Sequence, residues 1–66
     1  MKFYAIDYIG KLDCELVING ELYTTEEAAT AAKIQKYNTP EYEINWYTWA
    51  DLEEIFDDTN ELHILL

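Results

Sequence analysis

The dipeptide Asn19-Gly20 constrains the fold most, because both residues accept the positive φ angles that a two-residue hairpin turn requires. The preceding residues, 12–18, alternate apolar and charged side chains, which is typical of a half-buried strand. Residues 21–23 can return as a short strand. Residues 2–9 are also predicted to form a strand, which ends at a second expected turn, residues 10–11. The N-terminal third is therefore predicted to form antiparallel strands.

A helix is predicted over residues 25–37. The sequence Thr24-Thr25-Glu26-Glu27 reads as a capping box, with Thr24 as N-cap and Glu27 at the third helical position. Lysines near the C-terminal end suit the helix dipole, and Pro40 follows the end of the helix. The residues expected to face the sheet are Ala28, Ala31, Ile34 and Gln35.

A further strand is predicted over residues 41–48, followed by a short helix that Thr48 caps with Asp51 at the third helical position. The apolar stripe of this helix consists of Trp49, Leu52, Ile55 and Phe56. Residues 61–66 are expected to form a last strand, with an irregular hydrophobic tail as the alternative.

Together these elements predict one α+β domain spanning residues 1–66. The expected element order is β-β-α-β-α-β, with an antiparallel sheet and both helices packed on one of its faces. The large aromatic side chains expected in the core are Trp46, Trp49 and Phe56.

The charge of the chain restricts its partners. Fourteen acidic residues face four lysines and no arginine, which gives a formal net charge of −10. Because contacts with phosphate need lysine or arginine, we expect no direct binding to nucleic acid or to an anionic membrane. A basic protein is the expected electrostatic partner. Charged residues within the first seven positions and the lack of a long apolar stretch predict a cytoplasmic protein without a signal peptide.

Catalytic residue types are scarce, so the chain is not expected to be an enzyme. It has no serine, and Cys14 with His63 is the one nucleophile–base pair available. Cys14 lies on the predicted apolar face of its strand, where a small hydrophobic role is expected. The acidic run at residues 57–61 lacks the glycine and the distal glutamate of a calcium loop. We therefore expect neither a cofactor nor a metal site.

The second helix carries the candidate partner-binding carboxylates. They lie within eight residues and are Asp51, Glu53, Glu54, Asp57 and Asp58. In a continuous helix Asp51, Glu54 and Asp58 share one face, and the whole run spans about 12 Å. Such density approaches the phosphate spacing of duplex DNA. The alternative is that the run is only the solvated face of an amphipathic helix.

Tyrosines suggest a second kind of contact surface. Tyr8 and Tyr47 lie on sheet faces that could remain exposed, and tyrosine is favoured at interfaces. The alternative function is therefore a small interaction module, or a homodimer, that uses an aromatic sheet face. The same aromatic side chains can instead fill the core of so short a chain.

In its layout the chain resembles small phage-encoded inhibitor proteins. The resemblance covers residues 2–48: a hairpin, then Thr24-Thr25-Glu26-Glu27-Ala28-Ala29, then a strand, in a short and very acidic sequence. That class includes anti-CRISPR proteins and DNA-mimic inhibitors of nucleic-acid enzymes. The resemblance implies that carboxylates occupy the basic nucleic-acid-binding surface of a target enzyme in place of phosphates. Because the chain has no diagnostic motif of this class, no functional residue of the class can be assigned to a position in this sequence.

Overall fold

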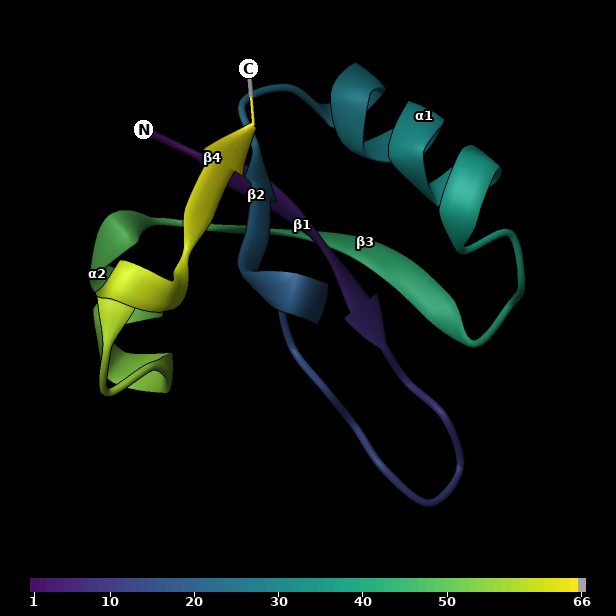
Figure 1. Cartoon of the computed structure of the whole chain (residues 1–66), viewed down its shortest axis with the longest axis horizontal. Coiled ribbons are helices and arrows are strands. Elements are labelled where there is room, and N and C mark those ends of the chain that lie inside the picture. Colours follow the sequence, from purple (N-terminus) through teal and green to yellow (C-terminus); the bar gives the residue numbers. More distant parts are fainter. Residues whose placement is uncertain (66) are drawn as a thin grey trace.

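The computed structural model describes residues 1–65 of the chain. Within these residues a four-stranded sheet combines with two α-helices and two short 3-10 helices (Figure 1). This confirms the predicted α+β class and the order of strands and helices. In chain order the elements are β1 (Phe3–Tyr8), η1 (Ile18–Gly20), β2 (Glu21–Tyr23), α1 (Glu26–Lys36), β3 (Tyr42–Tyr47), α2 (Trp49–Ile55), η2 (Thr59–Glu61) and β4 (His63–Leu65).

The strand order in the sheet is β3-β1-β2-β4. β3 runs antiparallel to β1 along its whole length, from Phe3 opposite Tyr47 to Tyr8 opposite Tyr42. β2 is also antiparallel to β1, but β4 is parallel to β2, so the prediction of a wholly antiparallel sheet is wrong. The connection through α2 and η2 carries the chain across the sheet, as strands of the same direction require. Leu66, the end of the last predicted strand, lies outside the described residues.

The strand predicted over residues 12–18 does not form in the described structure. The segment is a loop joined to β1 by one bridge, in which Tyr8 and Glu15 exchange backbone hydrogen bonds of 2.8 and 3.0 Å. Leu12 is 99% exposed, whereas Val17, on the other side of the predicted strand, is buried. Since β2 pairs directly with β1 at Tyr4, this edge of β1 has no room for a second long strand.

Asn19 and Gly20 do turn the chain with positive φ angles, 57° and 68°. They connect the loop to β2, however, and do not join two paired strands as predicted. Gly20 is also required by close packing, because a Cβ atom there would lie 2.4 Å from the carbonyl oxygen of Glu61. The absent side chain lets η2 approach the start of β2.

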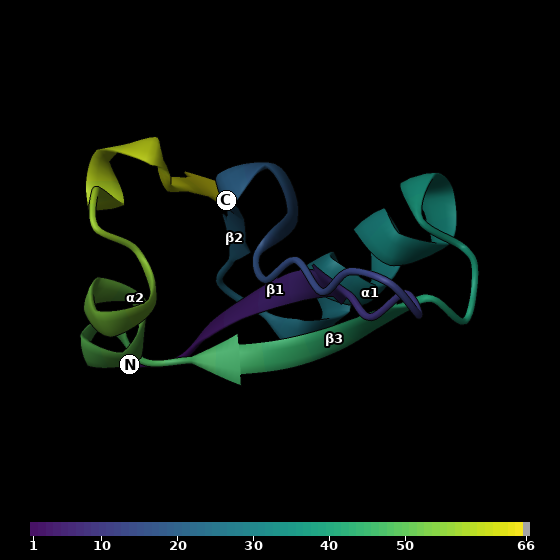
Figure 2. The same ribbon diagram turned by 90° about the horizontal axis from the view of Figure 1, so that it is seen from below.

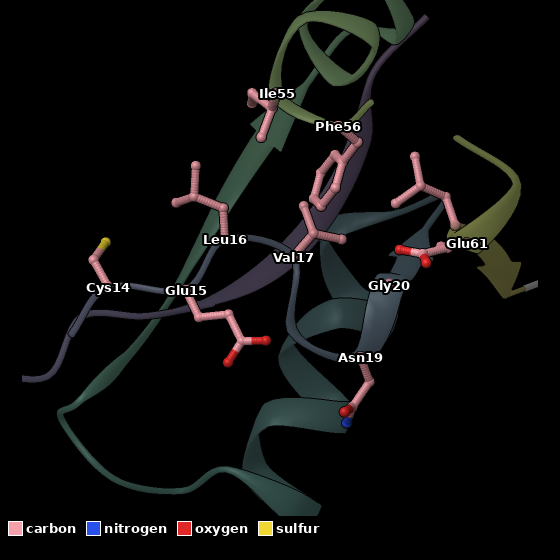
Figure 3. Close-up of a pocket in the computed structure, with 10 residues that line it drawn as sticks. Cys14, Glu15, Leu16, Val17, Asn19, Gly20, Ile55, Phe56 and Glu61 are labelled. Atoms are coloured by element: carbon pink, nitrogen blue, oxygen red, sulfur yellow. The ribbon is translucent and has the colours of Figure 1, made fainter. Parts of the chain in front are cut away.

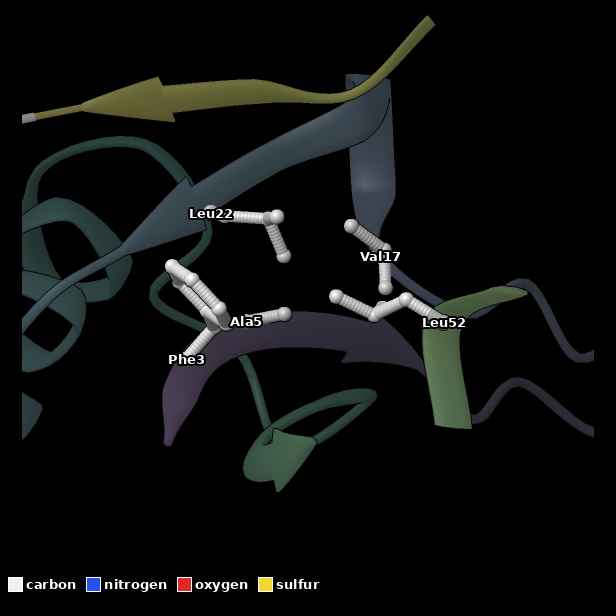
Figure 4. Close-up of a cluster of buried hydrophobic side chains, with 5 residues drawn as sticks. All are labelled: Phe3, Ala5, Val17, Leu22 and Leu52. Atoms are coloured by element: carbon white, nitrogen blue, oxygen red, sulfur yellow. The ribbon is translucent and has the colours of Figure 1, made fainter. Parts of the chain in front are cut away.

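Two hydrophobic clusters lie on opposite faces of the sheet, because neighbouring side chains of β1 point in opposite directions. The first consists of Phe3, Ala5, Val17, Leu22 and Leu52 (Figure 4). The second is built on Ile6, Tyr23 and Ala29. Leu52 belongs to α2 and Ala29 to α1, so the prediction that both helices pack on one face is wrong. β1 is buried on both faces, and each face therefore needs its own cover. The helices lie at opposite ends of the molecule (Figure 1, Figure 2).

The first helix begins one residue later than predicted. The Oγ1 atom of Thr25, and not that of Thr24, accepts a hydrogen bond of 3.1 Å from the backbone N–H of Ala28. The predicted buried face is right only for Ala28, which packs against the second cluster: Ala29 is the buried residue, and Ala31, Ile34 and Gln35 are exposed. With four alanines in five positions, this helix offers little contrast between its faces.

The tryptophans lie nearer the surface than predicted. Trp46, on the outer strand β3, is 52% exposed, and the Lys2 Nζ atom lies 4.4 Å from its ring centroid. Trp49 is also exposed and contacts the ring of Phe3 edge-on at 5.9 Å. Phe56 is half-buried against the first cluster. Leu22 and Leu52, which are completely buried, occupy the centre of that cluster instead.

Candidate partner-binding surface

Helix α2 starts with the predicted cap. The backbone N–H of Asp51 donates to Thr48 Oγ1 at 3.2 Å, and the N–H of Thr48 donates to Asp51 Oδ2 at 3.1 Å. The reciprocal pair satisfies two N–H groups at the helix start, where a carboxylate also suits the dipole. Asp51 therefore has a local structural role, although its side chain remains exposed.

The helix ends at Ile55, so the expected acidic helix face is interrupted. Phe56 adopts an extended backbone (φ −112°, ψ 128°) and turns its ring toward the first hydrophobic cluster. Asp58 therefore does not share a helical face with Asp51 and Glu54, contrary to the prediction. It caps η2 instead, where its Oδ1 accepts a hydrogen bond of 3.0 Å from the N–H of Asn60.

The carboxylates nevertheless remain together along the chain. We call the six exposed acidic residues of α2, η2 and the turn between them the acidic segment: Asp51, Glu53, Glu54, Asp57, Asp58 and Glu61. The segment occupies one end of the molecule, opposite α1, which carries Lys33 and Lys36 (Figure 1). The sequence has no lysine after Lys36, so the acidic segment contains no cation of its own.

Tyr8 and Tyr47 do not form one surface with each other. They point to opposite faces of the sheet, and the register places them at opposite ends of β3, where Tyr8 pairs with Tyr42. The Tyr8 hydroxyl donates to Glu41 Oε2 at 3.1 Å, and this hydrogen bond raises the pKa of Tyr8. Its ring packs on that of Tyr42, with centroids 5.2 Å apart. The tyrosines on the same sheet face as Tyr8 thus pack beneath α1 or along the margin of the sheet.

Tyr47 serves a buried polar network that the sequence analysis missed. Asp7 is completely buried, and its carboxylate accepts hydrogen bonds from the Tyr47 hydroxyl, from Asn45 Nδ2 at 2.7 Å and from the Val17 N–H at 2.8 Å. Burial, and then the hydrogen bond to Asp7, raise the pKa of Tyr47 well above its ordinary value. The burial of Asp7 could have been predicted from the sequence, because Asp7 shares a strand face with the apolar residues Phe3 and Ala5.

The Asp7 network holds the loop that follows β1. Val17 adopts a left-handed conformation with φ 52°, which is rare for a β-branched residue. Its N–H is fixed by Asp7, and its side chain is buried in the first cluster. This strained residue turns the chain so that Leu16 lies beside the end of α2 (Figure 3).

An open groove of about 470 Å³ lies between this loop and the α2–η2 end of the molecule. Its apolar lining is formed by Leu16, Val17, Ile55, Phe56 and Leu62, and its polar lining by Cys14, Glu15, Asn19, Gly20 and Glu61. Figure 3 shows Leu16, Ile55 and Phe56 gathered on one side and the polar groups of Glu15, Asn19 and Glu61 on the other. The groove thus combines a hydrophobic floor with carboxylates and, within the described residues, is lined by no lysine.

Cys14 lies in the groove and is exposed, so its expected burial is wrong. His63, the other member of the one available nucleophile–base pair, begins β4 and is not among the residues that line the groove. Within residues 1–65 no three His, Cys, Asp or Glu side chains are grouped so that they could hold a metal ion.

Comparison of the chain with protein-family models, with curated proteins and with solved structures gave no match. Neither helix of residues 1–65 has the length and apolar character needed to cross a membrane.

Proposed function

We propose that the chain is a non-catalytic inhibitor that occupies the basic nucleic-acid-binding surface of a target enzyme in the cytoplasm of a bacterial host. The observation that carries this proposal is the acidic segment, which presents six exposed carboxylates from consecutive elements without an intervening cation. A surface that serves only solubility usually mixes charges of both signs. Carboxylates displayed in this way attract a cleft lined by lysine and arginine and speed its association.

The resemblance to phage-encoded inhibitors supports the same proposal and adds a biological setting, the inhibition of a defence enzyme such as a CRISPR nuclease. The carboxylates would replace phosphates on that enzyme, and their positions would be set by α2 and by the turn that follows its last residue, Ile55. Glu53, Glu54 and Asp57 are the best candidates for direct contact, since Asp51 and Asp58 already cap helices.

An affinity capture from bacterial lysate, with nuclease present, tests this proposal. The test variant reverses Glu53, Glu54 and Asp57 to lysine, which leaves both caps intact. The matched control variant reverses Glu26, Glu27 and Glu43, three exposed acids outside the acidic segment, and so has the same net charge.

We expect wild type and control to retain the same nucleic-acid-handling enzyme and the test variant to lose it. Equal retention by all three proteins would refute a role for the acidic segment. Loss by both variants would show that net charge alone governs capture.

The second candidate function is self-association. The aromatic sheet face that motivated it packs largely beneath α1, but the outer edge of β3 is unpaired in the described structure and carries the exposed Trp46. Such an edge can pair with another chain. Sedimentation at high protein concentration tests this candidate: a dimer that Trp46→Lys dissociates supports it, and a strict monomer contradicts it.

A further inference from the structure

The groove between the residue 14–20 loop and the α2–η2 end is not needed for charge attraction alone. Its floor carries apolar side chains, among which Ile55 is 41% exposed although it ends a helix of the acidic segment. A purely electrostatic surface gains nothing from such side chains, and their contact with water is unfavourable. The groove therefore indicates a second component of recognition.

From this arrangement we infer that the groove binds a peptide segment of the partner in which one large apolar side chain is flanked by lysine or arginine. The apolar side chain contacts Leu16, Ile55 and Phe56, and the flanking cations lie near Glu15 and Glu61. The inference rests on the proposed function, since it describes how the same basic partner is held.

Charge complementarity selects this occupant. The groove is lined by two glutamates, Glu15 and Glu61, and Asp57 and Asp58 directly follow its lining residue Phe56 in the chain. An apolar segment with acidic neighbours would be repelled, and a neutral one would gain only the hydrophobic contact. Apolar anchors surrounded by complementary charges are typical of residues that dominate binding at interfaces.

A second copy of this chain is a weaker occupant. The sequence around Ile34, Lys33-Ile34-Gln35-Lys36, does flank an exposed apolar residue with lysines. Each copy, however, has a net charge of −10, which opposes association. Docking of α1 into the groove of another copy would also be a head-to-tail contact that need not close.

A peptide titration followed by NMR of the isotope-labelled full chain tests the inference. The probe is acetyl-Lys-Lys-Leu-Lys-Lys-amide. One control peptide replaces leucine by glycine and keeps the charge, and a second replaces the lysines by glutamates and keeps the anchor. The variant Ile55→Ala removes part of the groove, and Ile34→Ala is the matched control on α1.

We expect the leucine probe to shift the amide signals of Leu16, Gly20 and Leu62 and to protect Cys14, the single cysteine, from thiol labelling. The glycine peptide should bind roughly tenfold to a hundredfold more weakly, as expected for losing one buried leucine side chain. The glutamate peptide should not bind. Ile55→Ala should lower the affinity for the leucine probe several-fold, and Ile34→Ala should leave that affinity unchanged.

Equal affinity for the leucine and glycine peptides, or shifts that map outside the groove, would overturn the inference. If the lysate capture still depended on Glu53, Glu54 and Asp57, the proposed function would stand without it. Shifts of the groove amides that grow with protein concentration and disappear in Ile34→Ala would assign the groove to a second copy, and would also overturn the inference.

Discussion

At the scale of single residues, Asp7 organises the structure around β1. Its carboxylate joins the loop at Val17 to Asn45 and Tyr47 of β3, so a side chain in the centre of the sheet determines how the loop covers one face. Carboxylates are rarely buried without partners, and three donors compensate for the loss of water here. The groove depends on this network because Leu16 and Val17 line it.

Replacing Asp7 by alanine should lower the free energy of unfolding by about 3 kcal/mol, because the N–H of Val17 would be left buried without an acceptor. Urea denaturation measures this loss. Glu43→Ala is the control, since Glu43 lies opposite Asp7 in β3 but is exposed, and it should change stability by less than about 0.5 kcal/mol. Equal effects of the two substitutions would show that the network contributes little.

The raised pKa of Tyr47 predicts a loss of stability at high pH. The unfolded phenol ionises near pH 10, whereas the folded one keeps its proton to higher pH. The stabilisation is therefore complete below pH 10 and declines as the pH rises above it. Urea midpoints at about pH 9 and about pH 11 should fall farther for wild type than for Tyr47→Phe. An identical fall in both proteins would contradict the role given to this hydroxyl.

At the scale of elements, the sequence predicted helices more successfully than strands. Caps are local, and the reciprocal hydrogen bonds of Thr48 and Asp51 form as the spacing indicated. The strand predicted at residues 12–18 does not form, although both the alternation of its side chains and the turn signals on either side of it supported it. A strand needs a neighbouring strand with free backbone groups, and residues 12–18 would have had to pair with the edge of β1 that β2 occupies.

The candidate surface was predicted only in part for the same reason. Five of the six residues of the acidic segment were candidates from their spacing in the sequence, but Glu61 and the end of α2 at Ile55 were not predicted. The groove and the Asp7 network join residues more than 30 positions apart in the sequence, such as Leu16 with Ile55 and Asp7 with Asn45. Local patterns do not contain such contacts, which depend on the packing of the loop against both β1 and α2.

The one-residue difference at the start of α1 can be measured directly. Thr25→Ala should lower the free energy of unfolding by about 1 kcal/mol, because the N–H of Ala28 loses its acceptor. Thr24→Ala should cost clearly less, since the Thr24 side chain is not the cap. Thermal denaturation of both variants checks this expectation, and a larger loss for Thr24→Ala would restore the cap that the sequence had suggested.

At the scale of the whole molecule, the acidic segment lies apart from the lysines of α1. The chain forms a flat body of 28 × 28 × 16 Å, with α1 at one end and the acidic segment at the other (Figure 1). Lys33 and Lys36 lie in α1, whereas Lys2 lies against Trp46, three residues before α2 begins. The groove next to the acidic segment would add apolar contacts to the electrostatic attraction of a basic partner.

We propose that the acidic segment and nucleic acid compete for the same surface of the partner. The most direct measurement titrates the captured enzyme, bound to a fluorescent DNA duplex, with the wild-type chain at about 50 mM and about 300 mM salt. We expect stoichiometric displacement of the duplex at low salt, and displacement at least roughly tenfold weaker at high salt because exposed charges are screened. An enzyme that holds the duplex and the chain at the same time, with an affinity that salt does not change, would contradict it.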